Sequence, residues 1–419
     1  MTRALLFTGK GGVGKTSVAA ATAVRAATEG ARVLVTSTDP AHSLADALDV
    51  ALDDRPVEVA VPGASGRLAA QQVDAQARLE HHWSDIRDYL VALLSWSGIG
   101  EIAAEELVLL PGLDELFALI DLGSHLVGGE YDLVVVDCAP TAETLRLLAL
   151  PDALGWYVDK LAGPGRRMAR ALRPLVRGAG TTPLPLPDDA VFGTVERVHR
   201  DLAEVHALLQ DPARASIRLV CTPERLALAE TERTATTLSL FGYGVDAVVV
   251  NRVLPAEVHD PYFAAWKARH AANLAEVEST FAPTPVLRAP LLDDEVIGVG
   301  WLATLAEALY ADVDEASLRA PVRPVTVEPT AEGHALHIAL PFVGRAEVDL
   351  HRRGGDLHVK VAGVRRTIPL LGALRRDLVA GATLEDGRLE VRFVPDPAHT
   401  VGATVPVGGR RGKISEGRT

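Results

Sequence analysis

Cysteine and methionine are scarce in this sequence. Its 419 residues include two cysteines, Cys138 and Cys221, and two methionines, Met1 and Met168. Two thiols cannot supply a four-cysteine zinc site or iron–sulfur cluster within one chain, and they provide no disulfide framework, so a reducing compartment is expected. Two methionines also exclude the adaptable methionine-rich surface that some proteins use to bind apolar segments.

Long apolar runs and an excess of basic residues are missing as well. The longest clean apolar runs, such as residues 89–94, are far shorter than a membrane span. A formal net charge of −13 argues against a nucleic-acid-binding surface as the main function. Met-Thr-Arg and the short apolar run after it are too short for a signal peptide. We therefore expect a cytoplasmic protein with no nucleic-acid partner.

Short apolar segments alternate with helical patterns over most of the chain. Val and Leu occupy both odd and even positions of these segments, which is typical of strands buried on both faces of a parallel sheet. The predicted strands are 3–8, 32–37, 132–137, 217–222, 246–251 and 285–289, with helices at 17–28, 140–150 and 224–240 among others. This alternation predicts an α/β fold, a doubly wound and mostly parallel sheet, in a domain covering residues 1–318.

Two long segments between predicted strands and a change in composition near residue 320 complete the predicted domain organisation. The segments, about 74–127 and 152–211, are expected to form a helical subdomain, either as extra core helices or as a surface for an apolar partner. The Pro- and Val-rich residues 321–329 are typical of a linker. Strand periodicity and turn signals predict a small all-β sandwich at 323–397, followed by a flexible tail at 398–419.

The stretch TGKGGVGKT at residues 8–16 predicts a loop that binds nucleotide phosphates. A predicted strand precedes it and a predicted helix follows, which is the context such a loop requires. Its glycines let backbone N–H groups converge on phosphate oxygens, and the helix dipole adds to the attraction. Lys15 is expected at the β- and γ-phosphates and Thr16 at Mg²⁺. The candidate binding residues are Gly9, Gly11, Gly12, Val13, Gly14, Lys15, Thr16 and Ser17.

Two aspartates follow the second and third predicted strands, where ligands bind in open parallel sheets. Nucleotide hydrolysis needs one carboxylate to orient water and another in the metal shell. Asp39 and Asp137 are the candidates for these roles and, together with Thr16, for binding Mg²⁺. Each aspartate could instead cap a helix, although the four apolar residues before Asp137 favour the metal shell. Two roles stay open for His42, that of a catalytic residue and that of an ordinary loop residue.

The segments KGGVGKT, STDPAHSLADAL and DCAPTAETLRLL together resemble the ArsA-type ATPase family, over roughly residues 1–310. That family includes the arsenite-pump ATPase and the ATPase that delivers tail-anchored membrane proteins. The resemblance implies a homodimer in which Lys10 reaches across the interface to the nucleotide of the partner. It also implies that Asp39 activates water, that Asp137 begins the second switch and that Asn251 reads adenine.

The sequence departs from the family pattern at three points. The second switch, which is Pro-Thr-Gly-His-Thr in the family, is Pro-Thr-Ala-Glu-Thr at residues 140–144. Two cysteines are too few for a metalloid site of three thiols. The Cys-x-x-Cys zinc clasp of the eukaryotic targeting factors is also missing.

Residues 323–395 resemble the α-crystallin domain of small heat-shock proteins. The most specific part is residues 382–389, where Asp386-Gly387 predicts a hairpin turn. Val-Pro-Val at 405–407 is similar to the short tail that such domains dock in an edge groove. Two interpretations stay open: a structural appendage that packs on the ATPase core and closes a sheet edge, or a holdase-like, partner-docking module.

The leading hypothesis is a homodimeric, Mg²⁺-dependent ATPase whose cycle opens and closes a helical subdomain that binds hydrophobic segments, tail-anchored proteins among them. A soluble arsenite-pump-type ATPase is one alternative, against which the cysteine count argues. A ParA/MinD-like positioning ATPase is another, against which the acidic charge argues. A metal bridging Cys138 and Cys221 at a dimer interface is a remote option. No membrane receptor can be predicted.

Overall fold

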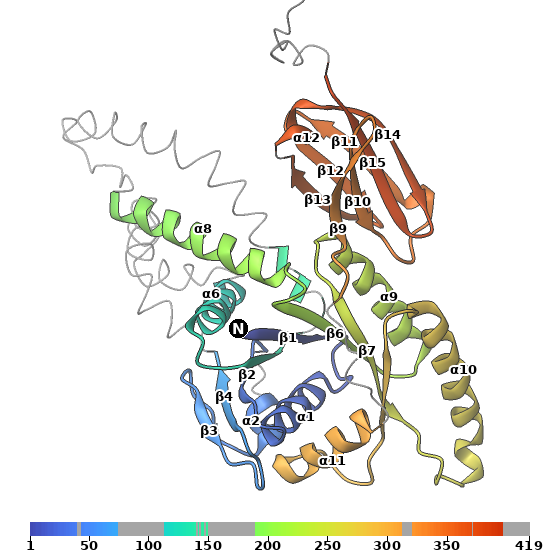
Figure 1. Cartoon of the computed structure of the whole chain (residues 1–419). Coiled ribbons are helices and arrows are strands. Elements are labelled where there is room, and N and C mark those ends of the chain that lie inside the picture. The colour runs from blue at the N-terminus through green and yellow to red at the C-terminus, as the bar shows by residue number, and fades with distance from the viewer. Residues whose placement is uncertain are drawn as a thin grey trace, which may run out of the picture.

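Two sheet-based units make up the described part of the chain (Figure 1). The computed structural model describes residues 1–39, 43–73, 113–139, 141, 144–145, 148–149, 189–311, 321–370 and 372–396. The N-terminal unit, residues 1–311, is built on an eight-stranded sheet. The C-terminal unit, residues 321–396, has a four-stranded and a three-stranded sheet.

The eight-stranded sheet has the order β3-β4-β2-β5-β1-β6-β7-β8. Its strands are β1 (Arg3–Thr8), β2 (Arg32–Ser37), β3 (Val57–Val59), β4 (Arg67–Gln72), β5 (Leu133–Asp137), β6 (Ala215–Cys221), β7 (Val245–Val253) and β8 (Val286–Pro290). Every pairing is parallel except that of β3 with β4. The predicted α/β class and all six predicted strands are confirmed. The sequence interpretation missed β3 and β4.

Helices cover both faces of this sheet, as a doubly wound fold requires. One face carries α1 (Lys15–Thr28), α2 (Ser43–Leu48) and α11 (Gly298–Tyr310). The other carries α6 (Leu113–Gly128), α8 (Asp189–Leu209), α9 (Arg225–Leu240) and α10 (Ala264–Phe281), with the short η1 (Pro261–Phe263) before α10. Figure 1 shows α1 beside α11 and α6 beside α8. None of the described helices is both long and apolar enough to cross a membrane.

Only part of the predicted helical subdomain can be compared with the structure. Helices α6 and α8 fall within it, whereas most of 74–127 and 152–188 lies outside the described residues. The apolar run at 89–94 and the tail at 398–419, with its Val-Pro-Val segment, also lie outside them.

The C-terminal unit is antiparallel throughout, and its sheets have the orders β14-β15-β10-β9 and β11-β12-β13. Its elements are β9 (Val325–Thr330), β10 (Gly333–Ala339), η3 (Arg345–Glu347), β11 (Val348–Arg353), β12 (Asp356–Val361), β13 (Val364–Pro369), α12 (Ala373–Arg376), β14 (Leu378–Glu385) and β15 (Arg388–Val394). The linker predicted at 321–329 is wrong from Val325 on, because β9 pairs with β10 there. Pro329 is tolerated since β9 is an edge strand.

The predicted hairpin in this unit is present. Asp386 and Gly387 join β14 to β15 with φ of 47° and 69°, the left-handed backbone that an Asp-Gly turn supplies. The core between the two sheets consists of alternate residues of facing strands, among them Leu336, Leu357 and Val391.

The C-terminal unit packs on the end of α9. Leu240, the last residue of α9, has no exposed surface and belongs to the apolar core of the C-terminal unit. Arg366 of β13 donates a hydrogen bond to the Leu240 carbonyl, and its guanidinium lies 5.7 Å from the centre of the Phe241 ring. Phe281, at the end of α10, contacts Phe342 with ring centres 5.0 Å apart. The two units therefore share apolar contacts.

Candidate nucleotide-binding site

The predicted phosphate loop connects β1 to α1, and close contacts restrict two of its glycines. A Cβ atom at Gly9 would lie 2.0 Å from the Val220 carbonyl oxygen of β6. At Gly14, where φ is 87°, it would lie 2.4 Å from Nδ2 of Asn251. Gly12 also has a left-handed φ, 81°. At Gly9 and Gly14 the backbone therefore lies closer to its neighbours than a residue with a Cβ atom would allow.

The tip of the loop is open and its base is anchored. Gly11 has open space around it, whereas Val13 is buried in the core on the α1 face. The Val13 carbonyl accepts a hydrogen bond from Asn251 Nδ2 at 2.8 Å. Lys15 begins α1 and is 6% exposed. The N-cap residue of α1 is Gly14, which has no side chain to cap the helix, so the first N–H groups remain suited to an anion.

Asp137 ends β5 and contacts the helix that follows the loop. Its Oδ2 accepts hydrogen bonds from Thr16 Oγ1 at 2.8 Å and from Ser37 Oγ at 3.2 Å. Within the described part of the chain, its Oδ1 is buried and accepts no hydrogen bond. Burial raises the pKa of Asp137 to about 6, although the Thr16 hydrogen bond and the charge of Lys15 act in the opposite direction. A buried carboxylate with an unused oxygen beside a threonine hydroxyl fits a divalent cation.

Asp39 is held next to Asp137 through backbone contacts. Its N–H donates to Ser37 Oγ at 3.2 Å, and its carbonyl accepts from Gln72 Nε2 at 2.7 Å. Ser37 therefore joins Asp39 to the Asp137 carboxylate. His42 lies outside the described residues, as do Pro140, Ala142 and Glu143 of the second switch.

Lys10 is directed toward α9. Its side chain is 50% exposed, and Nζ lies 3.9 Å from Glu230 Oε2. An ion pair this exposed is worth about 0–1 kcal/mol, so it leaves Lys10 free to move to another partner. Sequence reasoning missed Glu230, which is far from Lys10 in the sequence.

A cavity of about 680 Å³ opens beside the loop. Its lining includes Gly14, Ser17, Asn251 and residues 290–297, which run from the end of β8 to the start of α11. The Asn251 amide is already bonded to protein backbone, through Nδ2 to Val13 and through Oδ1 to the N–H of Arg252. The volume suits a nucleotide base. Sequence reasoning had not included residues 290–297 in the site.

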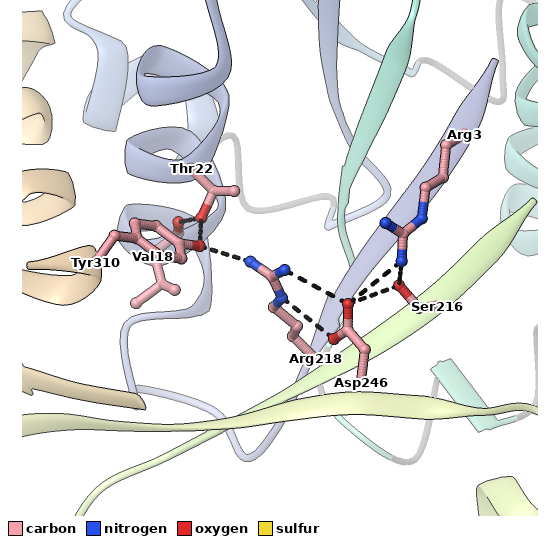
Figure 2. Close-up of polar contacts among 7 residues, drawn as sticks. All are labelled: Arg3, Val18, Thr22, Ser216, Arg218, Asp246 and Tyr310. Atoms are coloured by element: carbon pink, nitrogen blue, oxygen red, sulfur yellow. Dashed lines mark hydrogen bonds and ion pairs between the residues drawn. The ribbon is translucent and has the colours of Figure 1, made fainter. Parts of the chain in front are cut away.

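A buried ion pair holds the scaffold below the loop (Figure 2). Arg218 of β6 pairs with Asp246 of β7 at 3.2 Å, and the Asp246 side chain has no exposed surface. Arg218 also donates to the Tyr310 hydroxyl at 2.6 Å, which shares a hydrogen bond with Thr22 at 2.7 Å. Arg3 lies 3.7 Å from Asp246. The network joins α1, which begins at the phosphate loop, to α11, which follows the cavity.

Both cysteines are unsuited to binding metals. Cys138 and Cys221 are each 1% exposed, and burial raises the pKa of both thiols to about 12. Each thiol donates weakly to a backbone carbonyl, that of Val136 or of Val249. In the described ranges, no group of three or more His, Cys, Asp or Glu residues is placed to hold a metal ion.

A glycine-rich loop between β1 and α1, with a buried aspartate against its threonine, defines a nucleotide hydrolase of the phosphate-loop class. Residues 2–311 match the family model described as anion-transporting ATPase, ArsA type. Residues 331–393 match the model of the HSP20-like domain found in ArsA. The chain therefore belongs to the ArsA ATPase family, with that family's HSP20-like domain at its C-terminal end. Both predicted resemblances are confirmed.

Two relatives of this family match nearly the whole chain, and a third matches about three quarters of it. A provisionally named arsenical pump-driving ATPase of Chlorobaculum tepidum is 34% identical over 392 residues, 93% of this chain and 96% of that protein. An uncharacterized protein of Streptomyces coelicolor is 37% identical over 400 residues, 94% and 98% of the two chains. The ATPase ASNA1 homolog of Trypanosoma cruzi is 31% identical over 334 residues, 73% and 90% of the two chains.

Proposed function

We propose that this ATPase works as a Mg²⁺-dependent homodimer that couples ATP hydrolysis to the binding of hydrophobic protein segments. The observation that carries the proposal is the hydrogen-bonded series from Thr16 through Asp137 and Ser37 to Asp39. It connects the phosphate loop to the residue proposed to orient water.

The charged groups of the site suit a nucleotide with its metal ion. Lys15 would hold the β- and γ-phosphates, and its burial strengthens that attraction because water screens it less. Thr16, Asp39 and Asp137 would hold Mg²⁺, which supplies positive charge to the phosphate oxygens when bound. The unused Oδ1 of Asp137 supports this assignment. Adenine would occupy the cavity beside Asn251.

Changing Asp39 to Asn tests the water-activating role. The amide keeps the size of the carboxylate but is a far weaker base, so we expect ATP turnover to fall by about 10²–10⁴-fold with ATP binding retained. Phosphate release and titration with a fluorescent ATP analogue measure the two quantities. Asp46→Asn, at an exposed aspartate in nearby α2, is the matched control. Hydrolysis at the wild-type rate in Asp39→Asn would exclude Asp39 from this role.

The position of Lys10 supports a homodimer. Each chain has one phosphate loop, and Lys10 is directed toward Glu230 rather than into the Thr16–Asp137 cluster of its own chain. A half-exposed lysine at this position can reach a nucleotide held by a second copy. Hydrolysis would then require both subunits.

Hydrophobic protein segments are the client that the chain's features favour. The domain match to an HSP20-like module supports a chaperone-type role. The alternative, transport of arsenite, gains support from the name of the Chlorobaculum tepidum relative. The two buried thiols argue against it, because thiols with a pKa near 12 are poor metalloid ligands at neutral pH. The negative net charge continues to argue against a positioning ATPase that binds DNA.

A protection assay separates these functions. We would mix the protein with a detergent-released tail-anchored segment, and separately with an unfolding model substrate, in ADP and in a non-hydrolysable ATP analogue. Nucleotide-dependent solubility of either substrate is the expected result. Protection in neither state, together with arsenite-stimulated hydrolysis that is lost in a Cys138→Ser or Cys221→Ser variant, would favour the metalloid function instead.

Removing the C-terminal unit should lower stability without abolishing catalysis. Deletion of residues 321–419 would expose Leu240 and the neighbouring Phe241 and Phe281, and a buried side chain of this size contributes about 1.5–3 kcal/mol. We expect a lower unfolding temperature and aggregation, with turnover per folded molecule retained at low temperature. Deletion of residues 398–419 alone is the control. An unchanged unfolding temperature would show that the packing on α9 adds nothing to stability.

A further inference from the structure

We propose that Gln72 is a positioning residue for Asp39, and that the adjacent Gln71 transmits the state of the Asp39 loop to helix α6. The proposal rests on the ATPase cycle proposed above, and names the residues through which that cycle would reach the helical layer. Both glutamines end β4, the strand that neighbours β2 in the sheet.

Gln72 is a buried contact of the Asp39 carbonyl. Its side chain is 5% exposed, and Nε2 donates to the Asp39 carbonyl at 2.7 Å. Among the described residues, its Oε1 is buried and accepts no hydrogen bond. An unpaired buried oxygen is destabilising because it has lost its hydrogen bonds to water, so stability alone does not account for this glutamine. The presence of Gln72 is explained if its role is to hold the Asp39 backbone in position.

Gln71 makes the corresponding contacts on the opposite face. Side chains of successive strand residues point to opposite sides of a sheet, so Gln71 faces α6 while Gln72 faces Asp39. Gln71 is fully buried and donates through Nε2 to Asp121 Oδ2 at 2.9 Å and to the Asp54 carbonyl at 2.8 Å. Its Oε1 lies 3.1 Å from Nε2 of His125, which is 3.4 Å from Asp121. Asp121 and His125 both belong to α6.

The two sets of contacts form one continuous series. Ser37 of β2 pairs with Gln72 in the sheet register, and the Ser37 hydroxyl bonds both Asp39 and Asp137. A shift of the Asp39 carbonyl on nucleotide binding or hydrolysis would therefore pull on the end of β4. Gln71 directly precedes Gln72 in β4 and contacts α6. A movement of Gln72 would therefore be passed through Gln71 to α6. A second arrangement of this loop, favoured by one nucleotide state, is what the coupling requires.

Gln72→Met tests the positioning role. Methionine keeps the length of the side chain and removes both the donor and the unpaired oxygen. We expect the kcat for ATP to fall about fivefold, the equivalent of one lost hydrogen bond, with KM and the unfolding temperature nearly unchanged. Gln210→Met is the matched control, since Gln210 also donates through Nε2 to a backbone carbonyl, that of Phe241, away from the site. A purely structural glutamine would change the unfolding temperature and not kcat.

Hydrogen exchange of residues 113–128 tests the second half of the proposal. In the wild-type chain we expect the exchange of α6 to differ between ADP and a non-hydrolysable ATP analogue. His125→Phe removes the contact of Gln71 Oε1 with α6 and keeps the edge contact with Tyr131 at a ring distance of 5.8 Å. This variant should hydrolyse ATP within twofold of wild type and show a smaller difference between the two nucleotides. It also avoids substituting the fully buried Gln71.

The outcomes separate this inference from the proposed function. If the wild-type chain does not hydrolyse ATP, both fail. Wild-type hydrolysis with unchanged kcat in Gln72→Met overturns the positioning role and leaves the ATPase proposal intact. A nucleotide response of α6 that is undiminished in His125→Phe, or is missing from the wild-type chain, overturns the transmission to α6.

Discussion

Replacing Lys10 with alanine is expected to reduce ATP turnover by about 10³–10⁵-fold while sparing nucleotide binding. This is the effect of removing a charge supplied in trans at the transition state, as with an arginine finger. Lys10 is half-exposed and paired only loosely with Glu230, so its loss should not disturb the fold. Phosphate release and nucleotide titration measure the two properties. Lys360→Ala, in β12 of the C-terminal unit, is the control.

Mixed dimers test whether Lys10 acts across an interface. A Lys10→Ala chain keeps its own Lys15 and so binds ATP, whereas a Lys15→Ala chain keeps Lys10. Mixing the two inactive variants should restore part of the wild-type turnover, because the nucleotide on the first chain meets Lys10 from the second. If the mixed dimers stay inactive, Lys10 acts within its own chain and the trans account is wrong.

The second large effect is expected at the ion pair of Figure 2. Arg218→Met would leave Asp246 buried with Arg3, at 3.7 Å, as its remaining cationic neighbour in the described part of the chain. Breaking a buried pair by removing one partner costs about 3–5 kcal/mol, since the remaining charge is poorly compensated. We expect a loss of this size in the free energy of unfolding, measured by urea denaturation.

A double variant provides the control for this prediction. Arg218→Met combined with Asp246→Leu removes both charges and should recover much of the lost stability, because apolar replacements of a buried pair are often neutral. Tyr310→Phe, which removes one hydroxyl bonded to Arg218 and Thr22, should cost about 1–3 kcal/mol. A loss below about 1 kcal/mol in Arg218→Met would show that Arg3 or water replaces the missing guanidinium.

Strands rich in Val and Leu were predictable because their burial follows from their own composition. Strand β4, RLAAQQ, was not, since alanines and glutamines have little strand propensity. Its last two residues are buried because Asp39, Asp121 and His125 bond them, and those residues are distant in sequence. The prolines at 321, 324 and 329 likewise favoured a linker, whereas an edge position permits β9 to pair.

The candidate site was predictable to the extent that one motif or one strand end contains it. The loop glycines, Lys15, Thr16 and the two aspartates were all named from local patterns. The cavity wall at 290–297, the Glu230 contact of Lys10 and the glutamines of β4 required the fold, because each joins segments far apart in the chain. The sequence left open whether the C-terminal unit is an appendage that packs on the ATPase core or a partner-docking module.

The burial of Leu240 also bears on the order in which the protein matures. Synthesis proceeds from the N-terminus, and domains generally fold as they emerge. The last turn of α9 is therefore complete well before the strands of the C-terminal unit, to whose apolar core Leu240 belongs. Until β15 has left the ribosome, the nascent ATPase carries a bare apolar helix end that chaperones and proteases can recognise. A chain that terminates early, after the nucleotide site is complete, would thus carry its own signal for degradation.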